Sequence, residues 1–237
     1  MRLTLVRNAT VILELEGRRI LVDPMLDDVG TRPPVPNTAN PVPNPTVPLP
    51  FSAEEVVRRL DAVVVTHRHR DHLDARAEEL LPHDVPVFCQ PEDEEALGEL
   101  ELEARAVAGE LTWDGLRIVR TPARHGFGAI AEALAPVSGF LLNDVYVAGD
   151  TVWYEGVAET IERHEPRVAV LNAGGARFLE GGLIVMGIED VREVAARVPV
   201  VVAVHMEALN HCYLTRAELR SALPDVFVPE DGETLEA

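Results

Sequence analysis

The sequence predicts an α+β protein in which two β-sheets pack against each other and helices cover their outer faces. The first half of the chain is rich in short apolar runs with β-branched residues, the pattern of buried strands. In the second half, such runs alternate with segments of helical periodicity. Hydrophobic residues make up 47% of the 237 residues, which is enough for a sizeable core, and we expect one domain over residues 1–237.

Strands are expected where apolar residues run together or alternate with polar ones. The turn at Glu16-Gly17 joins two of the first strands, and Asn143-Asp144 is typical of a hairpin turn. The expected strands are residues 3–6, 10–15, 18–22, 62–65, 85–89, 116–121, 137–142, 145–148, 167–171, 199–204 and 225–228.

Helices are expected where a capping sequence or a helical period appears. Ser52-Ala53-Glu54-Glu55 and Thr215-Arg216-Ala217-Glu218 are capping boxes, in which the first side chain and the last one each accept a backbone N–H at the helix start. The expected helices are residues 52–60, 73–81, 91–100, 157–164, 188–198 and 215–223.

Residues 31–50 form a proline-rich segment with eight prolines. This density blocks helix formation and sheet pairing and favours an extended backbone. A long loop in a compact domain is commonly functional. The segment could be a lid beside the active site, a passive surface loop, or a contact between subunits of a homo-oligomer.

The charge balance argues against nucleic acid and membranes as partners. Lys and Arg number 21 and Asp and Glu number 40, so the net charge is −19. Such a chain is repelled by nucleic acid and by anionic membrane surfaces. No apolar run approaches the roughly 20 residues that span a bilayer, no signal peptide is apparent, and Cys89 and Cys212 form no disulfide framework. We therefore expect a cytoplasmic protein that acts on a small molecule.

The most informative stretch is His67-Arg68-His69-Arg70-Asp71-His72, which directly follows the expected strand 62–65. Three of the chain's eight histidines fall in these six positions. Imidazole nitrogen and carboxylate oxygen are ligands that zinc and similar divalent metals prefer. One short loop of this kind could hold two metal ions about 3.5–4 Å apart, the spacing of dinuclear hydrolytic sites.

This His-x-His-x-Asp-His loop after a strand resembles the signature of the metallo-β-lactamase superfamily. The resemblance implies a four-layer αββα sandwich. The opening strands and the Asp23-Pro24 turn also resemble the family, although Arg7-Asn8 stands where a related branch has a Gly-His pair. The role of Asn8 is therefore open. Among the branches, the chain is most similar to the L-ascorbate-6-phosphate lactonase-like group of small metal-dependent hydrolases.

The resemblance implies three further ligands outside this loop. His125 takes the place of the family's third histidine, Asp150 in Gly149-Asp150-Thr151 that of the bridging aspartate, and His205 that of the last histidine. A loop histidine, a helix-capping aspartate and a core histidine are the structural alternatives. The implied ligand set is His67, His69 and His125 on one metal, Asp71, His72 and His205 on the other, and Asp150 between them.

The implied activity is hydrolysis by a hydroxide that bridges two divalent ions, Zn²⁺ or Mn²⁺, with iron also compatible. The hydroxide would attack an ester-type bond, either a lactone or other cyclic ester or a phosphodiester. The expected catalytic residues are Asp71, Asp150 and His211, although His211 could instead contact the substrate or orient a ligand carboxylate. His69 favours hydrolysis, because flavodiiron relatives carry a glutamate there. Two alternatives stay open: a mononuclear iron thiol or persulfide dioxygenase, and a binding protein without catalysis.

Substrate contacts are expected next to the ligands in the sequence. Asn172 and Arg177 flank the glycine-rich turn after strand 167–171, and Arg177 could hold an anionic substrate. Trp153 follows Asp150 closely and could form part of the pocket wall. A tight turn with a surface arginine and a core aromatic are the corresponding structural alternatives. Cys212 is expected to be a packed residue, since the metal-activated water already supplies a nucleophile.

Overall fold

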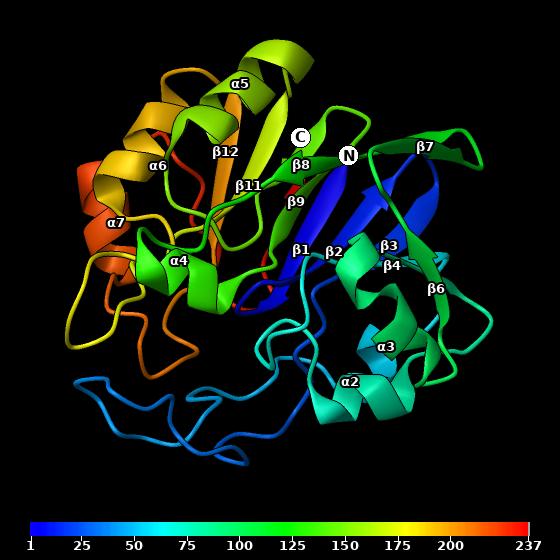
Figure 1. Cartoon of the computed structure of the whole chain (residues 1–237), viewed down its shortest axis with the longest axis horizontal. Coiled ribbons are helices and arrows are strands. Elements are labelled where there is room, and N and C mark those ends of the chain that lie inside the picture. Colours follow the sequence, from blue (N-terminus) through cyan, green and yellow to red (C-terminus); the bar gives the residue numbers. More distant parts are fainter. Residues whose placement is uncertain (237) are drawn as a thin grey trace.

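Two β-sheets lie face to face with helices on their outer sides in the computed structural model, which describes residues 1–236 (Figure 1). The first sheet contains, in spatial order, β13 (Thr234–Glu236), β1 (Arg2–Arg7), β2 (Thr10–Leu15), β3 (Arg18–Val22), β4 (Ala62–Val65), β5 (Pro86–Cys89) and β6 (Glu103–Ala106). The second contains β12 (Val200–Val204), β11 (Val168–Asn172), β10 (Val145–Val147), β9 (Ser138–Leu142), β8 (Leu116–Pro122) and β7 (Glu110–Trp113).

The helices fall into two groups, one for each sheet. The first-half helices α1, α2 and α3 lie beside the first sheet, and α5, α6 and α7 lie beside the second (Figure 1). The helices are α1 (Ala53–Val56), α2 (Ala75–Leu80), the 3-10 helix Pro91–Asp93, α3 (Glu94–Gly98), α4 (Ala129–Leu134), α5 (Glu155–His164), α6 (Ile188–Ala195) and α7 (Arg216–Ala222).

Three apolar clusters account for this layered arrangement. The central cluster joins the inner faces of the two sheets, for example Leu13 and Val64 of the first with Phe140 and Val202 of the second. The other two clusters pack the outer face of each sheet against its helices. Burial of apolar area is the main stabilising term of folding. Because each sheet carries apolar residues on both faces, one face packs against the other sheet and the opposite face packs against helices, which produces four layers. The predicted α+β class and αββα sandwich are thus confirmed.

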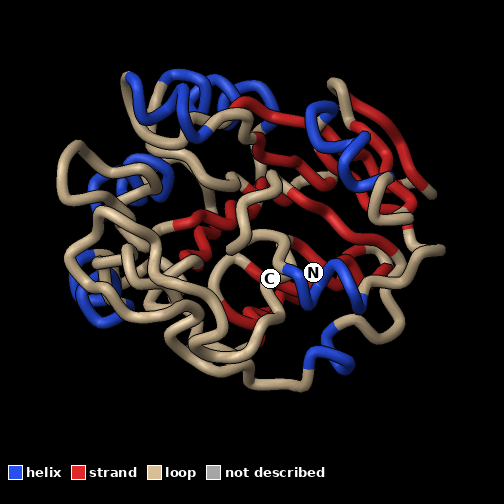
Figure 2. The backbone as a smooth tube through the Cα atoms, turned by 60° about the horizontal axis from the view of Figure 1, so that its bottom comes forward, coloured by secondary structure: helices blue, strands red, loops and turns tan. Residues whose placement is uncertain are grey.

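The parallel strands determine where the functional loops lie. Strands β3, β4, β5 and β6 run parallel to one another, and so do β10, β11 and β12. The carboxyl ends of parallel strands meet at one edge of a sheet, where ligand sites of α/β folds commonly form. In Figure 2, tan loops gather on the face at which these strands end. Among the described residues, no helix is long and apolar enough to cross a membrane.

Several element boundaries differ from the sequence-based predictions. Helix α1 ends at Val56 instead of residue 60, and Arg59 adopts a left-handed φ of 55°. Helix α2 begins at Ala75, because the Asp74 side chain caps it by accepting the N–H of Ala77. The expected helix 91–100 divides into a 3-10 turn and α3, α6 is shorter than predicted, and residues 225–228 contribute only a single bridge between Phe227 and Val202.

Four elements were not predicted: β6, β7, β13 and α4. Strands β6 and β7 lie at sheet edges and carry exposed charged residues such as Arg105 and Glu110. Helix α4 buries none of its side chains and has no side-chain cap. Without a buried face, the sequence of such an element has no clear hydrophobic period.

The proline-rich segment contains no helix or strand and makes one isolated bridge, between Arg32 and Asn44. It forms the blue loop below the sheets in Figure 1, on the face where β1 ends. The buried guanidinium of Arg7 donates hydrogen bonds to the carbonyls of Met25, Asp27 and Val47, at 2.8, 2.9 and 3.1 Å. Arg7 of β1 therefore holds the segment at Val47 and also holds the residues just before the segment.

Candidate metal centre

Five chain segments converge at the carboxyl ends of the strands. His67 to His72 follow β4, and His125 lies three residues after β8. Asp150 follows β10 by way of Gly149, and His205 directly follows β12. Asn172 is the last residue of β11. Because β4 belongs to one sheet and the other strands to the second, the side chains meet at the end of the sandwich, between its two sheets.

The first group of potential ligands comprises His67, His69, His125 and Asp150. One ligand atom from each lies within 4.8 Å of all the others. Nε2 of His67 is 2.9 Å from Nδ1 of His69. Oδ2 of Asp150 is 3.2 Å from Nε2 of His125 and 3.9 Å from Nε2 of His67. Three imidazole nitrogens and one carboxylate oxygen therefore face a common point.

The second group comprises Asp71, His72, His205 and again Asp150, within the same 4.8 Å limit. Oδ1 of Asp150 is 3.2 Å from Nε2 of His72 and 3.7 Å from Nε2 of His205. Oδ2 of Asp71 is 3.4 Å from Nε2 of His205. Asp150 thus presents one oxygen to each group. The structure brings together the seven side chains that the sequence singled out; that each one binds metal stays a prediction.

Two observations show that this cluster is suited to cations. Nε2 of His72 and Nε2 of His205 are buried without a hydrogen-bond partner, an arrangement that is costly unless something else binds them. The carboxylates also attract positive charge. Burial lowers the pKa of His72, but Asp150 and Asp23 more than offset this and raise the pKa to about 10. Divalent metal ions would supply that charge while leaving the imidazoles neutral.

Two further cluster members, His67 and Asp150, have pKa shifts that suit metal ligands. Burial, together with the neighbouring His72, lowers the pKa of His67 well below its usual value. Burial raises the pKa of Asp150, but the surrounding His72, His205 and His125 have the larger combined effect. The net pKa of Asp150 is therefore well below its usual value. Neutral imidazole and ionised carboxylate are the forms that bind metal.

Asp23, which the sequence analysis noted only in the turn after a strand, contacts one of the potential ligands. Its Oδ2 lies 2.8 Å from Nδ1 of His72 and accepts the hydroxyl of Thr66 at 2.8 Å. Its Oδ1 accepts the backbone N–H of Thr66 at 2.8 Å. A carboxylate on Nδ1 leaves Nε2 of the ring facing the cluster, which is how such partners orient metal-binding histidines.

Other polar groups orient the remaining cluster members. Nδ1 of His125 lies 2.7 Å from the Ile184 carbonyl, and Nδ1 of His205 lies 3.5 Å from Sγ of Cys212. Asn8, whose role the sequence left open, connects two ligand loops. Its side chain donates to the Asp71 carbonyl at 2.9 Å, and its own carbonyl accepts the N–H of His205 at 2.8 Å.

Replacement of Asp23 by alanine is expected to weaken metal binding about 10- to 100-fold, the usual effect of losing a partner that orients a ligand histidine. The reason is that the His72 ring would lose its fixed orientation. Competition with a chromophoric chelator measures the change. Asp61→Ala is the matched control, because Asp61 accepts the N–H of Arg19 at 2.7 Å just before β4, at the end away from the cluster. Equal affinities for the two variants would contradict the role of Asp23.

A cavity of about 400 Å³ opens onto the cluster. His69, Asp71 and His125 line it together with His211, whose Nδ1 is buried without a hydrogen-bond partner. Most of the remaining wall is apolar, and part of it comes from the proline-rich segment. These wall residues are Pro33, Pro34, Val35, Pro36, Leu134, Phe178, Ile184 and Leu209, with Arg32, Asn44 and Arg70 beside them.

The three predicted substrate contacts lie elsewhere. Asn172 is buried and donates to Oδ1 of Asp150 at 2.7 Å, so it orients a cluster carboxylate. Arg177 stacks over the Tyr213 ring at 5.3 Å and lines a separate surface hollow. Trp153 packs against the outer helical layer, with the Arg197 guanidinium 4.8 Å from its ring. Neither Arg177 nor Trp153 lines the cavity at the cluster.

For this reason Arg177→Ala is expected to leave kcat/KM within about twofold of wild type, as for surface substitutions in general. A substrate whose anionic group needed Arg177 would instead lose one to two orders of magnitude. Steady-state kinetics on the metal-loaded variant distinguishes these outcomes.

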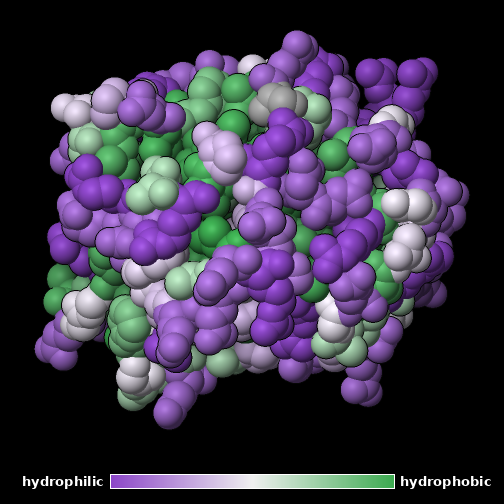
Figure 3. Space-filling view, turned by 90° about the horizontal axis from the view of Figure 1, so that it is seen from above, coloured by the Kyte–Doolittle hydropathy of each residue, from purple (hydrophilic) through white to green (hydrophobic). Residues whose placement is uncertain are grey.

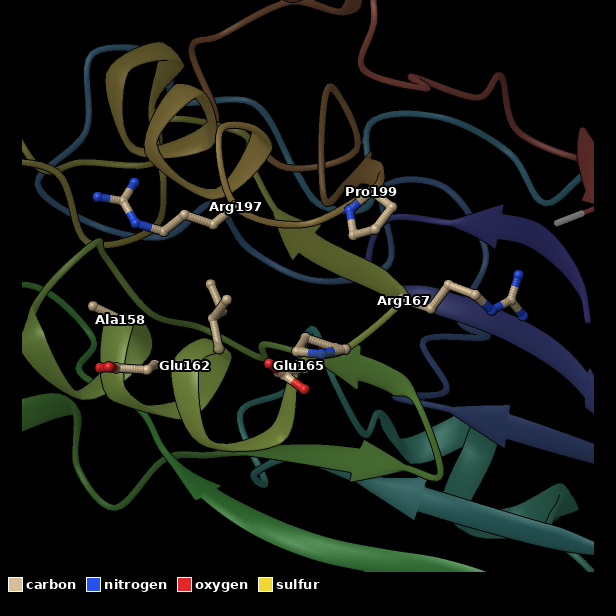
Figure 4. Close-up of a pocket in the computed structure, with 8 residues that line it drawn as sticks. Ala158, Glu162, Glu165, Arg167, Arg197 and Pro199 are labelled. Carbon is tan, nitrogen blue, oxygen red and sulfur yellow. The ribbon is translucent and has the colours of Figure 1, made fainter.

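A wider hollow of about 630 Å³ lies at the opposite ends of β11 and β12, bounded by Glu165 and Pro199 (Figure 4). Its two guanidinium groups are paired, Arg167 with Asp144 at 2.9 Å and Arg197 with Glu193 at 2.7 Å. Hydrophilic residues cover most of the molecule seen from above, the face turned away from the proline-rich segment (Figure 3). The potential metal ligands line the cavity of about 400 Å³ instead.

Comparison with known proteins agrees with this geometry. The sequence model of the β-lactamase superfamily domain matches residues 18–206. A UPF0173 protein of Bacillus subtilis is 35% identical, with 99% of each chain covered. A UPF0173 metal-dependent hydrolase of Methanocaldococcus jannaschii is 29% identical, with 79% of this chain and 87% of the relative covered.

Two solved structures have nearly the same fold. A possible metal-dependent hydrolase from Veillonella parvula superposes with a TM-score of 0.94 at 32% identity, covering 99% of this chain and 98% of the other. An isothiocyanate hydrolase from Delia radicum gut bacteria superposes with a TM-score of 0.91 at 35% identity, covering 100% and 99%. The lactonase-like branch expected from the sequence stays a prediction.

Proposed function

The chain belongs to the β-lactamase superfamily and to its UPF0173 group of metal-dependent hydrolases, and on this basis we propose that it hydrolyses a small, uncharged substrate with two divalent metal ions. The observation that carries the proposal is Asp150, whose two oxygens face two separate ligand groups. The mixed nitrogen and oxygen donors suit Zn²⁺ or Mn²⁺, and iron would also be accepted.

When bound, such ions lower the pKa of a water toward neutrality and polarise the bond under attack. The side chains of this protein would do the rest. The carboxylates of Asp150 and Asp71 would bind the metal ions and balance their positive charge. Asp71 also lines the cavity. His211 would donate a proton to the leaving group, since its buried Nδ1 has no other partner.

The cavity favours a carbon electrophile over a phosphodiester. Its wall is mostly apolar, and its two nearby cations are already neutralised. Arg32 is paired with Asp27 at 3.2 Å and Arg70 with Glu78 at 2.8 Å. One guanidinium nitrogen of Arg32, Nη2, is buried without a hydrogen-bond partner, so it could donate to a neutral acceptor. An ester or lactone with an apolar group fits these properties better than an anionic phosphodiester does.

An isothiocyanate is a second candidate substrate. A solved relative that is 35% identical over nearly the whole chain is an isothiocyanate hydrolase. An isothiocyanate is small, uncharged and apolar, and its central carbon is electrophilic. Addition of one water and cleavage of the N–C bond would give an amine and carbonyl sulfide.

The test combines metal analysis with a substrate panel. Protein purified without chelators should contain about two equivalents of zinc or manganese per chain. It should hydrolyse aryl esters, lactones or alkyl isothiocyanates at least about tenfold faster than bis-p-nitrophenyl phosphate, and chelation should abolish the activity until metal is restored. One equivalent of iron with oxygen consumption would favour a dioxygenase. Failure to take up any metal would leave a binding protein.

A further inference from the structure

The proline-rich residues 31–46, which we call the strap, are held in place by two buried asparagines. Asn210, which precedes His211, is 1% exposed, and Asn44 within the strap is 3% exposed. Asn44 donates from Nδ2 to Oδ1 of Asn210 at 2.8 Å, and its own Oδ1 accepts the backbone N–H of Asn210 at 2.8 Å. This reciprocal pair joins positions 166 residues apart.

Asn210 also holds the middle of the strap. Its Oδ1 accepts the N–H of Val35 at 3.0 Å. Its Nδ2 lies within hydrogen-bond distance of the Val35 carbonyl (3.2 Å), the Thr38 hydroxyl (2.7 Å) and the Asn40 carbonyl (2.8 Å). Only a side-chain amide offers both an acceptor and two donors at this length, so neither aspartate nor alanine can replace it.

The strap has further contacts with the segment that follows β12. Thr46 donates its hydroxyl to the Glu207 carbonyl at 2.6 Å and its N–H to the Ala208 carbonyl at 2.9 Å. The N–H of Ala39 donates to the Tyr213 hydroxyl at 2.8 Å. The segment that carries His205 and His211 is therefore also the support of the strap.

The held residues form one wall of the cavity. Pro33, Pro34, Val35 and Pro36 line it, and Leu134 and Phe178 from other segments also line it. Proline has a fixed φ and cannot easily rearrange, so the position of this wall depends on the contacts that anchor it. Those contacts are centred on Asn210.

We propose that Asn210 and Asn44 are specificity-determining residues: they fix the strap as a rigid apolar wall that limits the width of the substrate's uncharged group. This inference rests on the proposed function for its kinetic part, because the wall can select only a substrate that the site hydrolyses. The anchoring itself is independent of substrate identity. The strap would act as a fixed wall rather than as a lid that opens in each cycle.

The structural test is hydrogen–deuterium exchange of the metal-loaded full chain. In Asn210→Ala, the amides of Arg32, Val35 and Asn44 should exchange at least about tenfold faster than in wild type, since the anchoring hydrogen bonds are lost. Metal content should equal that of wild type, because Asn210 is not in either ligand group. Asn40→Ala is the matched control: its side chain is exposed and only its carbonyl is used by Asn210.

The kinetic test compares p-nitrophenyl acetate with the bulkier p-nitrophenyl diphenylacetate. The ratio of kcat/KM, bulky over small, should rise about tenfold or more in Asn210→Ala and stay at the wild-type value in Asn40→Ala. If Asn210→Ala does not fold, Asn44→Asp replaces the amide that donates to Oδ1 of Asn210 by an oxygen at constant size, and it should change both measurements in the same direction.

The outcomes separate the two proposals. Unchanged strap exchange in Asn210→Ala or Asn44→Asp would overturn the anchoring role. Faster exchange with an unchanged selectivity ratio would overturn the specificity role. If wild-type protein hydrolyses neither ester, the ester-type reaction is wrong, and the same ratio is measured with allyl and naphthyl isothiocyanate.

Discussion

Replacing Asp150 with alanine should reduce bound metal from about two equivalents to less than one and lower kcat/KM by about 10³-fold or more. Asp150 is the only residue common to both ligand groups, and each of its oxygens faces one of them. Without it, each group keeps three ligands and the two groups lose their shared anion. Metal-centred charge stabilisation contributes several kcal/mol, and each 1.36 kcal/mol corresponds to a factor of ten in rate.

Metal content by plasma mass spectrometry and steady-state kinetics on the same preparation measure both effects. Asp28→Ala is the control, because Asp28 is exposed and uses only its backbone carbonyl in hydrogen bonds. If Asp150→Ala retained two metal ions and wild-type turnover, the two-metal assignment would be wrong. A variant with one tightly bound ion and full activity would instead indicate a mononuclear enzyme.

The buried part of the fold could be predicted because its signal is local. The run Ala62–Val65 is wholly apolar and β-branched in three of four positions, and it forms β4 at the predicted residues. The two capping boxes begin α1 and α7 as expected. Strand β13, by contrast, is defined by pairing with β1 at the other end of the chain. The three residues of β13 carry no sequence signal that specifies a partner at the opposite end of the chain.

The same contrast separates the potential ligands from the residues that orient them. The spacing in His67-x-His69-x-Asp71-His72 is itself a sequence pattern, so it could be interpreted directly. Asp23 contacts Thr66 from 43 positions away, and Asn44 contacts Asn210 from 166 positions away. Polar residues of this kind acquire their role only when the strands assemble. Arg177 shows the converse: although it lies close to Asn172 in sequence, it lines a separate hollow, whereas Asn172 contacts Asp150.

The second large effect is expected at Gly149, which positions Asp150 from the preceding residue. Gly149 has a φ of +66°, a left-handed conformation that glycine adopts without strain. A Cβ atom there would lie 2.4 Å from the Ser138 carbonyl oxygen and 3.3 Å from Cβ of Thr66. Because the first contact is backbone at the start of β9, the clash cannot be relieved by rotating a side chain.

Gly149→Ala should therefore lower the free energy of unfolding by about 3 kcal/mol, combining the strained φ with displacement of the Asp150 loop. For a chain of this size the melting temperature should fall by about 6–12 °C. Measuring both in excess chelator separates folding from metal binding, and a titration with Zn²⁺ then reports the affinity, which should also fall. Gly182→Ala is the matched control: a Cβ there meets nothing within 4 Å and its φ is not left-handed. If the two variants unfolded at the same denaturant concentration, the close approach of Gly149 to β9 would not limit stability. The explanation of why glycine is needed before Asp150 would then be wrong.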